Sequence, residues 1–275
     1  MKNQLGASLK NIRQQQHLSQ KDVARNICAQ SMLSAIENGK YVPNAKLLIN
    51  LCERLSISLN DISLLNDFEI SNNQKLNQNL TVLCNSHEYS KLKTFLTNTE
   101  TIKQIQTSEQ IQAYYYYLAV ANLHVSSNLT AAEQNLKLSI SSSEETRVTS
   151  SLKRLGLVSL SLIKAKEGRI TESDNLLKKA TQSIQNAVYE ENLNIVFYLA
   201  ALIKYETNST ENSLKWLEKG ISYITEHDSH YMLANCYHLL ATIAKNSGKK
   251  DLQLQAQRRS SFLRELFGEK INENL

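Results

Sequence analysis

Residues 18–39 read LSQKDVARNICAQSMLSAIENG, and this stretch decides the fold of the first quarter of the chain. Ser19 is a good N-cap for a short helix, because its side chain can accept a hydrogen bond from a first-turn N–H. After a tight turn, Leu33 and Ile36 give a second helix its apolar side. Gly39 suits the left-handed residue that ends such a helix. Two short helices joined in this way predict a helix-turn-helix motif.

Further helices are expected on both sides of the motif. Leu5, Leu9 and Ile12 recur at helical spacing and predict a helix before it. Pro43 opens the loop to a fourth helix, and a short fifth helix is expected at residues 59–65. The apolar side of the fourth helix carries Leu47, Leu48, Leu51 and Leu55.

The second helix of the motif has a side suited to reading DNA. Ser31, Ala35 and Asn38 lie opposite its apolar side, with Ser34 beside them and Gln30 at the N-terminal end. These side chains are short or carry an amide. A helix of this kind can lie deep in a major groove with its side chains at base edges.

Charge supports a nucleic-acid partner. Residues 1–65 hold eight Lys or Arg and four Asp or Glu, so four of the five net positive charges of the chain fall there. Such charges neutralise phosphates, and binding should therefore weaken steeply with salt. Each lysine could also be an ordinary solvated side chain. The expected phosphate contacts are Lys10, Lys21, Lys40 and Lys46.

The segment resembles the five-helix domain of the phage-repressor and Xre class, and its short turn is closer to the PlcR-like branch. His17 stands where that class often has glycine. The resemblance implies that Arg13 pairs structurally with Glu37. It also implies that Gln20 touches phosphate and braces the readout helix. The alternative is a small helical domain that binds no DNA. The implied DNA-binding residues are Gln20, Lys21, Gln30, Ser31, Met32, Ser34, Ala35, Asn38 and Lys40.

Composition predicts an all-α chain of two domains. The 275 residues include one proline and seven glycines, and helix formers dominate every long segment. No apolar run suggests a signal peptide or a membrane span, and the four cysteines lack metal-ligand spacing. We therefore expect a cytoplasmic protein with reduced thiols and no metal or cofactor. The Asn-, Gln- and Ser-rich stretch at 66–79 predicts a linker between a DNA-binding domain at 1–65 and a second domain at 80–275.

The second domain repeats with a period of 40 residues. Asn128, Gly168, Asn208 and Gly248 occur at this interval, and each suits a left-handed turn after a helix. A small residue precedes each of them by seven positions. This spacing predicts about five stacked helical hairpins from residue 74 to 267, with a non-repeating bundle as the alternative. The pattern resembles tetratricopeptide repeats, which implies a right-handed superhelix. The small residues are Ala121, Ser161, Ala201 and Ala241.

In such a superhelix the first helix of each hairpin lines the concave side. The positions of this helix that should face inward can be counted back from the turn residues. They form a mostly apolar surface with amides and tyrosines, which suits an extended peptide. The amides would pair with the peptide backbone, and a lysine would meet its terminal carboxylate. Any one of these residues could instead be plain packing between repeats. The expected peptide-binding residues are Tyr115, Asn122, Tyr198, Lys204, Tyr205, Asn235, His238 and Lys245.

A helix-turn-helix joined to degenerate repeats resembles the peptide-pheromone receptors grouped with PlcR, PrgX and Rgg. The resemblance implies a homodimeric quorum-sensing regulator that binds a two-fold operator, with half-sites roughly 34 Å apart or a multiple of that distance. A short hydrophobic signalling peptide would change its activity by a coupling of about 1 to 3 kcal/mol. No residue pattern predicts an enzyme. The alternatives are a phage- or plasmid-type repressor whose repeats bind a protein, and a scaffold with a vestigial N-terminal domain.

Overall fold

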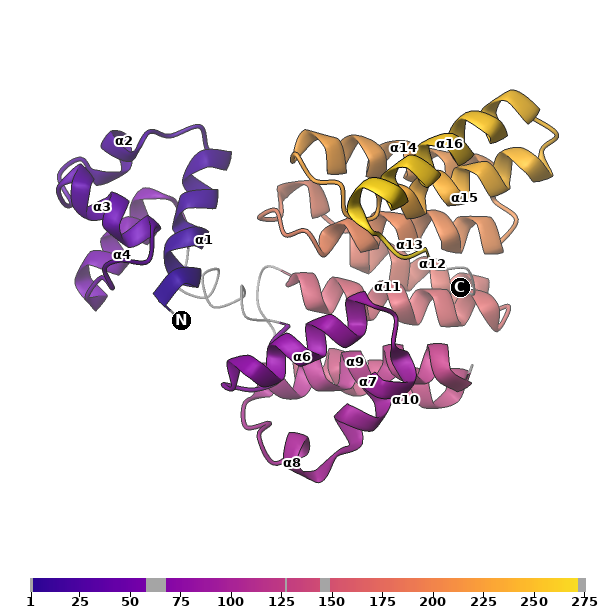
Figure 1. The fold of residues 1–275 in the computed structure, drawn as a ribbon, viewed down its shortest axis with the longest axis horizontal. Coiled ribbons are helices and arrows are strands. Elements are labelled where there is room, and N and C mark those ends of the chain that lie inside the picture. The colour runs from indigo at the N-terminus through magenta and orange to yellow at the C-terminus, as the bar shows by residue number, and fades with distance from the viewer. Residues whose placement is uncertain (1, 58–67, 127, 144–148, 272–275) are drawn as a thin grey trace. The chain divides into compact units, whose positions relative to one another are not determined.

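The structure is a computed structural model that describes residues 2–57, 68–126, 128–143 and 149–271. Within these ranges the chain forms helices, turns and loops and contains no strand, so the all-α prediction is confirmed. The chain divides into two compact units, Met1–Phe68 and Glu69–Leu275 (Figure 1). None of the described helices is long and apolar enough to span a bilayer.

The first unit contains four described helices around a small apolar core. The expected fifth helix at 59–65 lies outside the described residues. The core side chains are those that the helical spacing predicted, with Leu9, Ile12, Leu33 and Ile36 almost fully buried. The helices are α1 (Lys2–Gln15), α2 (Gln20–Ala24), α3 (Gln30–Glu37) and α4 (Ala45–Arg54).

The predicted ends of these helices are confirmed. Ser19 and Asp22 form a capping box at the start of α2, in which each side chain bonds the backbone N–H of the other residue. His17 has φ 53° and Gly39 has φ 68°, so both take the left-handed conformation expected of them. Asn26, with φ 61°, supplies the same conformation in the turn between α2 and α3.

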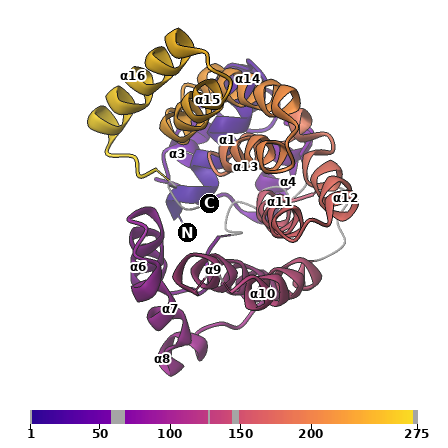
Figure 2. The ribbon, with the colours of Figure 1, turned by 90° about the vertical axis from the view of Figure 1, so that its right-hand side faces the viewer.

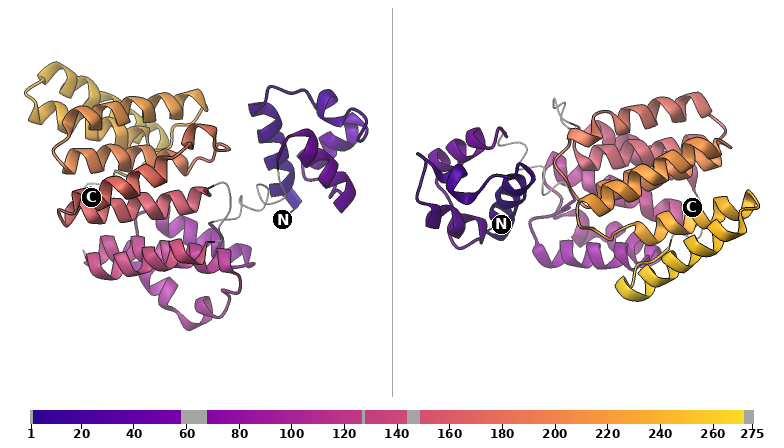
Figure 3. Two further views of the ribbon diagram at one scale, coloured as in Figure 1. Left: turned by 180° about the vertical axis from the view of Figure 1, so that it is seen from behind. Right: turned by 90° about the horizontal axis from the view of Figure 1, so that it is seen from above.

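The second unit is a stack of antiparallel helix pairs. Figure 2 looks along the stack, with α10, α12 and α14 on its outer side and α9, α11 and α13 nearer its axis. Figure 3 shows the same pairs from the side, layer upon layer. The pairs are α6 (Gln74–Asn85) with α7 (Tyr89–Thr97), α9 (Ser108–Ser126) with α10 (Leu129–Ser142), α11 (Ser151–Lys166) with α12 (Ile170–Thr181), α13 (Leu193–Glu206) with α14 (Thr210–Glu226), and α15 (Leu233–Asn246) with α16 (Lys250–Phe267). The short helices α8 (Thr99–Ile102) and η2 (Ile184–Asn186) lie between pairs.

The repeat turns follow the prediction at three of four positions. Gly168, Asn208 and Gly248 have φ of 75°, 56° and 70°. Asn128 does not, and the prediction is wrong there. Its φ is −81°, and its side chain instead caps α10 by accepting a hydrogen bond from the Ala131 N–H. Asparagine suits both roles, so the period alone could not separate them.

The small residue seven positions before each turn is buried where paired helices approach. Ser161 shows why a small side chain is needed. Its hydroxyl donates to the Ser173 carbonyl at 2.7 Å, and the Ser173 hydroxyl donates to the Ser161 carbonyl at 2.8 Å. Ser213 makes the same bond to the Ala201 carbonyl one repeat later. The repeated small residues therefore allow close packing of the paired helices, and the serines at or opposite them also form hydrogen bonds between these helices.

The described part of the predicted linker, residues 69–79, belongs to the second unit. Ile70 is fully buried, and its backbone N–H donates to the side chain of Asn77. The Asn77 amide in turn donates to the Ser71 carbonyl at 2.7 Å. The helix α6 begins at Gln74, inside the predicted linker. The amide-rich composition of this stretch serves helix capping and buried hydrogen bonds, which composition alone does not distinguish from a solvated linker.

Candidate DNA-binding surface and ligand groove

A buried ion pair holds α3 against α1. The Arg13 Nε and Nη2 atoms donate to the two carboxylate oxygens of Glu37 at 2.6 and 2.9 Å, and only 8% of Arg13 and 4% of Glu37 is exposed. The third nitrogen, Nη1, donates to the Leu18 carbonyl at 2.9 Å. The bond to Glu37 raises the pKa of Arg13. The structural pairing expected from the family resemblance is confirmed.

The ion pair continues outward as a hydrogen-bonded chain. Gln20 Nε2 donates to Glu37 Oε2 at 2.7 Å, and Gln30 Nε2 donates to Gln20 Oε1 at 2.6 Å. Gln20 begins α2 and Gln30 begins α3, so the chain fixes the starts of the two motif helices relative to each other. It ends at Gln30, which is exposed.

The other side chains expected to touch DNA are accessible. Lys21, Ser31, Met32, Asn38 and Lys40 are exposed, while Ser34 and Ala35 are half-buried on the same helix. The Asn38 amide donates to the Ser34 carbonyl at 2.8 Å and closes the end of α3. With Gln20 and Gln30, the expected set consists of small and amide side chains, one exposed methionine and two exposed lysines.

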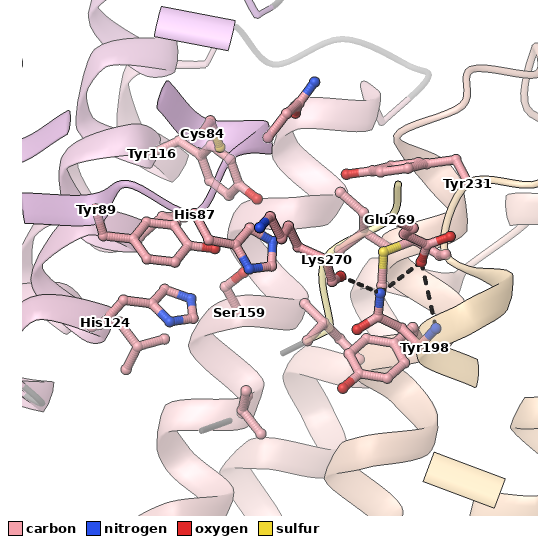
Figure 4. Close-up of a pocket in the computed structure, with 18 of the residues that line it drawn as sticks. Cys84, His87, Tyr89, Tyr116, His124, Ser159, Tyr198, Tyr231, Glu269 and Lys270 are labelled. Atoms are coloured by element: carbon pink, nitrogen blue, oxygen red, sulfur yellow. Dashed lines mark hydrogen bonds between the residues drawn. The ribbon is translucent and has the colours of Figure 1, made fainter. Parts of the chain in front are cut away.

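A cavity of about 270 Å³ lies inside the second unit (Figure 4). Its walls come from helices of all five pairs, from the end of α6 to the residues after α16. Apolar side chains such as Val120, Leu136 and Leu162 make up much of the lining. The polar side chains in the wall include His87, Tyr89, Tyr116, His124, Ser159, Tyr198, His230, Tyr231, Asn235, Glu269 and Lys270.

One wall of the cavity is built from stacked rings. Tyr89 and His124 stack with their centroids 3.9 Å apart, and His87 stacks on Tyr89 at 5.3 Å. Burial lowers the pKa of His124 to about 4 and also lowers the pKa of His87. At neutral pH this wall is therefore aromatic and uncharged.

The opposite wall holds the segment that follows α16. The Asn235 amide donates to Glu269 Oε1 at 2.6 Å and to the Lys270 main-chain carbonyl at 3.0 Å, as the dashed lines in Figure 4 mark. Gly268 ends α16 in the left-handed conformation, with φ 67°, and turns the chain toward the cavity. Burial raises the pKa of the Glu269 carboxyl group.

Two of the eight expected peptide-binding residues, Tyr198 and Asn235, line the cavity, and the other six do not. Lys204 pairs with Asp174 at 2.6 Å. The Tyr205 hydroxyl accepts a hydrogen bond from Asn246. Asn122 is buried and Lys245 is exposed, while Tyr115 and His238 are half-buried, all outside the cavity lining.

Six of these predictions failed because the helix positions that face the cavity change from one repeat to the next. From α9, the positions 12, 9, 8, 5 and 4 residues before the turn line the cavity, whereas α15 contributes only the position 13 residues before its turn. Each pair is rotated relative to the last, so one fixed set of offsets cannot describe every repeat. The sequence reasoning also missed the walls outside the repeat register. These are residues 84–89, 230–232 and 267–270, for which no periodic signal exists.

Sequence comparison identifies the first unit. Residues 9–62 match the helix-turn-helix family. The ImmF control region 10 kDa protein of Bacillus phage phi105 is 37% identical over 57 residues, which are 20% of this chain. The match spans 63% of that relative, so it concerns the helix-turn-helix domain alone.

Structural comparison covers the whole chain. The crystal structure of Bacillus thuringiensis PlcR in complex with the peptide PapR7 and DNA matches with a TM-score of 0.65, over 97% of this chain and 96% of that one, at 20% identity. This chain has the PlcR fold. The apo form of PlcR matches with a TM-score of 0.58 and 18% identity, over 96% of this chain and 94% of that one. The apo competence regulator ComR from Streptococcus vestibularis matches with a TM-score of 0.50 and 14% identity, over 98% and 94% of the two chains.

Proposed function

We propose that this chain is a DNA-binding transcription regulator controlled by a short peptide in the cavity of its second unit. One observation carries the peptide half of the proposal. The Asn235 side chain already binds another segment of the chain in the cavity wall, through a hydrogen bond to the Lys270 main-chain carbonyl. A side-chain amide bonded to a main-chain carbonyl is a form of peptide recognition that does not depend on sequence.

The DNA half of the proposal rests on the first unit. The hydrogen-bonded chain from Arg13 through Glu37 and Gln20 orders Gln30 before any DNA binds. A pre-ordered amide loses little side-chain freedom when it pairs with a base. We propose Gln30 as the residue that reads a base. Contacts with the DNA backbone would come from Gln20, Lys21, Asn38 and Lys40. Ser31, Met32, Ser34 and Ala35 would border the groove.

We also propose a homodimer that acts in the cytoplasm on a two-fold operator. Two helix-turn-helix domains related by two-fold symmetry read half-sites one helical turn, roughly 34 Å, or a multiple apart. A peptide that binds one dimer arrangement better than another shifts the balance between them. A difference of about 1 to 3 kcal/mol is sufficient for such coupling. PapR7 is the peptide bound to PlcR in the structure described above.

A second candidate is a phage-type repressor whose second unit binds a protein. The relative from phage phi105 favours it, because that control-region protein resembles this chain in the helix-turn-helix domain. The cavity favours the hypothesis that the second unit binds a peptide. A space of about 270 Å³ walled by all five helix pairs suits an inserted chain segment better than the surface of a folded protein.

The first test is selection of DNA from the genome of the source organism by the purified chain. The recovered site is then titrated with synthetic peptides encoded by short open reading frames beside the gene. A peptide that changes the affinity for the site supports the proposed regulator and reveals the sign of its effect. If DNA is bound and no peptide alters the affinity, a repressor with a protein partner becomes the better hypothesis.

A further inference from the structure

Glu269 has one satisfied and one unsatisfied carboxylate oxygen in the cavity wall. Oε1 accepts from the Asn235 amide at 2.6 Å and faces the Asn235 backbone N–H at 3.4 Å. Oε2 is buried and makes no hydrogen bond within the described part of the chain, although the Ala234 backbone N–H is close enough to the carboxylate to lower its pKa. An unpaired buried oxygen of a carboxylate is costly, because it has lost water without gaining another donor.

The surroundings of Glu269 are mainly aromatic. Figure 4 shows Tyr231 and Tyr198 above and below the carboxylate, and both phenols are close enough for its charge to affect their pKa. His230 lies close enough to Glu269 to lower the pKa of its carboxyl group. The Lys270 ammonium acts instead on His87, at the other side of the cavity. No described residue forms an ion pair with Glu269.

Two features of this site favour a cationic group over a neutral donor. The carboxylate supplies a negative charge in a space where water screens it poorly, so a cation gains more than an amide does. The two tyrosine rings beside the carboxylate belong to a class of side chain whose ring faces also attract cations. An ammonium or guanidinium group fits both features at once.

We propose that Glu269 is a specificity residue of the cavity, selecting peptides that carry an ammonium or guanidinium group for its unpaired Oε2. This inference rests on the proposed peptide function and adds the charge of the ligand to it. Asn235 takes part as a positioning residue, because its amide holds Oε1 and thereby fixes the carboxylate in the cavity wall. The C-terminal segment thus acts as part of the binding site.

The test uses the full chain and three pools of synthetic hexapeptides. Five positions in each pool are randomised among Leu, Phe, Ser, Asn and Gly, and one position is fixed as Lys, acetyl-Lys or Glu. Bound peptides are separated by gel filtration and counted by mass spectrometry. The variants are Glu269→Gln, Glu269→Lys and a control, Glu265→Gln, which changes an exposed carboxylate on α16 outside the cavity lining.

The wild type and Glu265→Gln should capture the Lys pool on the order of tenfold better than the acetyl-Lys pool, as expected for a charge-assisted hydrogen bond. Glu269→Gln should still capture peptides but lose this preference. Glu269→Lys should prefer the Glu pool, a reversal that a merely structural role would not produce.

Capture of all pools equally by the wild type overturns the proposal and leaves the peptide function standing. The same holds if Glu269→Gln keeps the preference for Lys. A chain that lacks residues 268–275 provides a further check. If it binds all three pools more tightly than the full chain and without charge preference, the C-terminal segment is a competitor of the peptide, which also overturns the proposal. Capture of no pool by any variant overturns the peptide function itself.

Discussion

At the scale of single residues, the first unit depends on one carboxylate. Glu37 accepts three hydrogen bonds, two from Arg13 and one from Gln20, and Gln20 in turn positions Gln30. The last residue of α3 therefore orders the first residue of the same helix. Sequence reasoning reached the Arg13–Glu37 pair through a family resemblance. It did not reach the bond from Gln30 to Gln20, because a hydrogen bond between two exposed amides leaves no mark on hydrophobic spacing.

Gln30→Ala should weaken binding to the selected DNA site by about 1 to 3 kcal/mol, because the amide would lose a bidentate contact with a base. Gel-shift titration at fixed salt measures the change. Gln14→Ala is the matched control, since Gln14 is an exposed glutamine of α1, and this variant should bind like the wild type. Unchanged affinity in Gln30→Ala would remove this residue from base reading.

The half-buried imidazole of His124 should make stability depend on pH. Its pKa falls to about 4 in the folded chain, against a value near 6.5 when unfolded. Between these values the unfolded chain binds more protons. The free energy of unfolding should therefore fall as the pH drops from about 6.5 to 4, by about 3 kcal/mol in all.

Denaturant unfolding of the wild type and His124→Phe between pH 4 and 7.5 measures this effect. Phenylalanine keeps a flat ring against Tyr89 but cannot bind a proton, so its curve should fall less steeply. His17→Asn, at an exposed histidine of the first unit, is the control, because asparagine also tolerates the left-handed conformation of this residue. Parallel curves for the wild type and His124→Phe would show that His124 does not titrate with unfolding.

At the scale of helices, short sequence patterns predicted where helices begin, end and repeat. They did not predict which side of each repeat helix faces the cavity. The capping box at Ser19, the left-handed Gly39 and the 40-residue period each followed from a short stretch of sequence. The direction that a repeat helix presents to the cavity depends on rotation accumulated over several pairs. For this reason Tyr198 and Asn235 reach the cavity while His238, which occupies in α15 the repeat position of Tyr198 in α13, does not. The walls at residues 84–89 and 267–270 lie outside the period altogether.

The close packing of α1 against α3 can be tested by substitution of Gly6. A Cβ atom at Gly6 would lie 2.0 Å from the Ile36 carbonyl oxygen, which is backbone and cannot simply turn aside. Gly6→Ala should therefore push the two helices apart and destabilise the first unit by about 1 to 3 kcal/mol.

Thermal unfolding followed by circular dichroism, together with gel-shift titration, measures the Gly6→Ala effect. Gly156→Ala is the comparison in the second unit, where the new atom would meet only the side chain of Ile140, at 3.1 Å. It should leave DNA binding unchanged. A Gly6→Ala variant with wild-type stability and DNA affinity would contradict the close packing of α1 on α3.

At the scale of the whole molecule, the two proposed binding sites fall in separate units. All residues that line the cavity fall between Cys84 and Lys270, within the second unit, and the proposed DNA contacts fall between Gln20 and Lys40, within the first. In the proposed dimer no residue serves both tasks, so we propose that a signal from the cavity reaches the DNA contacts through a change in how the units are arranged.

Deletion of residues 1–68 should leave a dimer, because we place the dimer contacts in the second unit. Light scattering of residues 69–275 measures the mass directly, and circular dichroism checks that the helices are retained. The deleted chain should also keep its preference among the peptide pools. A folded monomer would contradict a dimer held by the repeats.

The cavity draws on both ends of the helix stack, with Cys84 to Tyr89 from the first pair and Phe267 to Lys270 after the last. Stacked repeats contact mainly their neighbours, so an array can lose its outermost pairs while the middle stays folded. A molecule bound in this cavity touches pairs that are far apart along the array. It would stabilise only the state in which every pair is in place. Binding would therefore suppress fraying at the ends and make the array melt as a single unit, sharpening its unfolding transition as well as raising its midpoint.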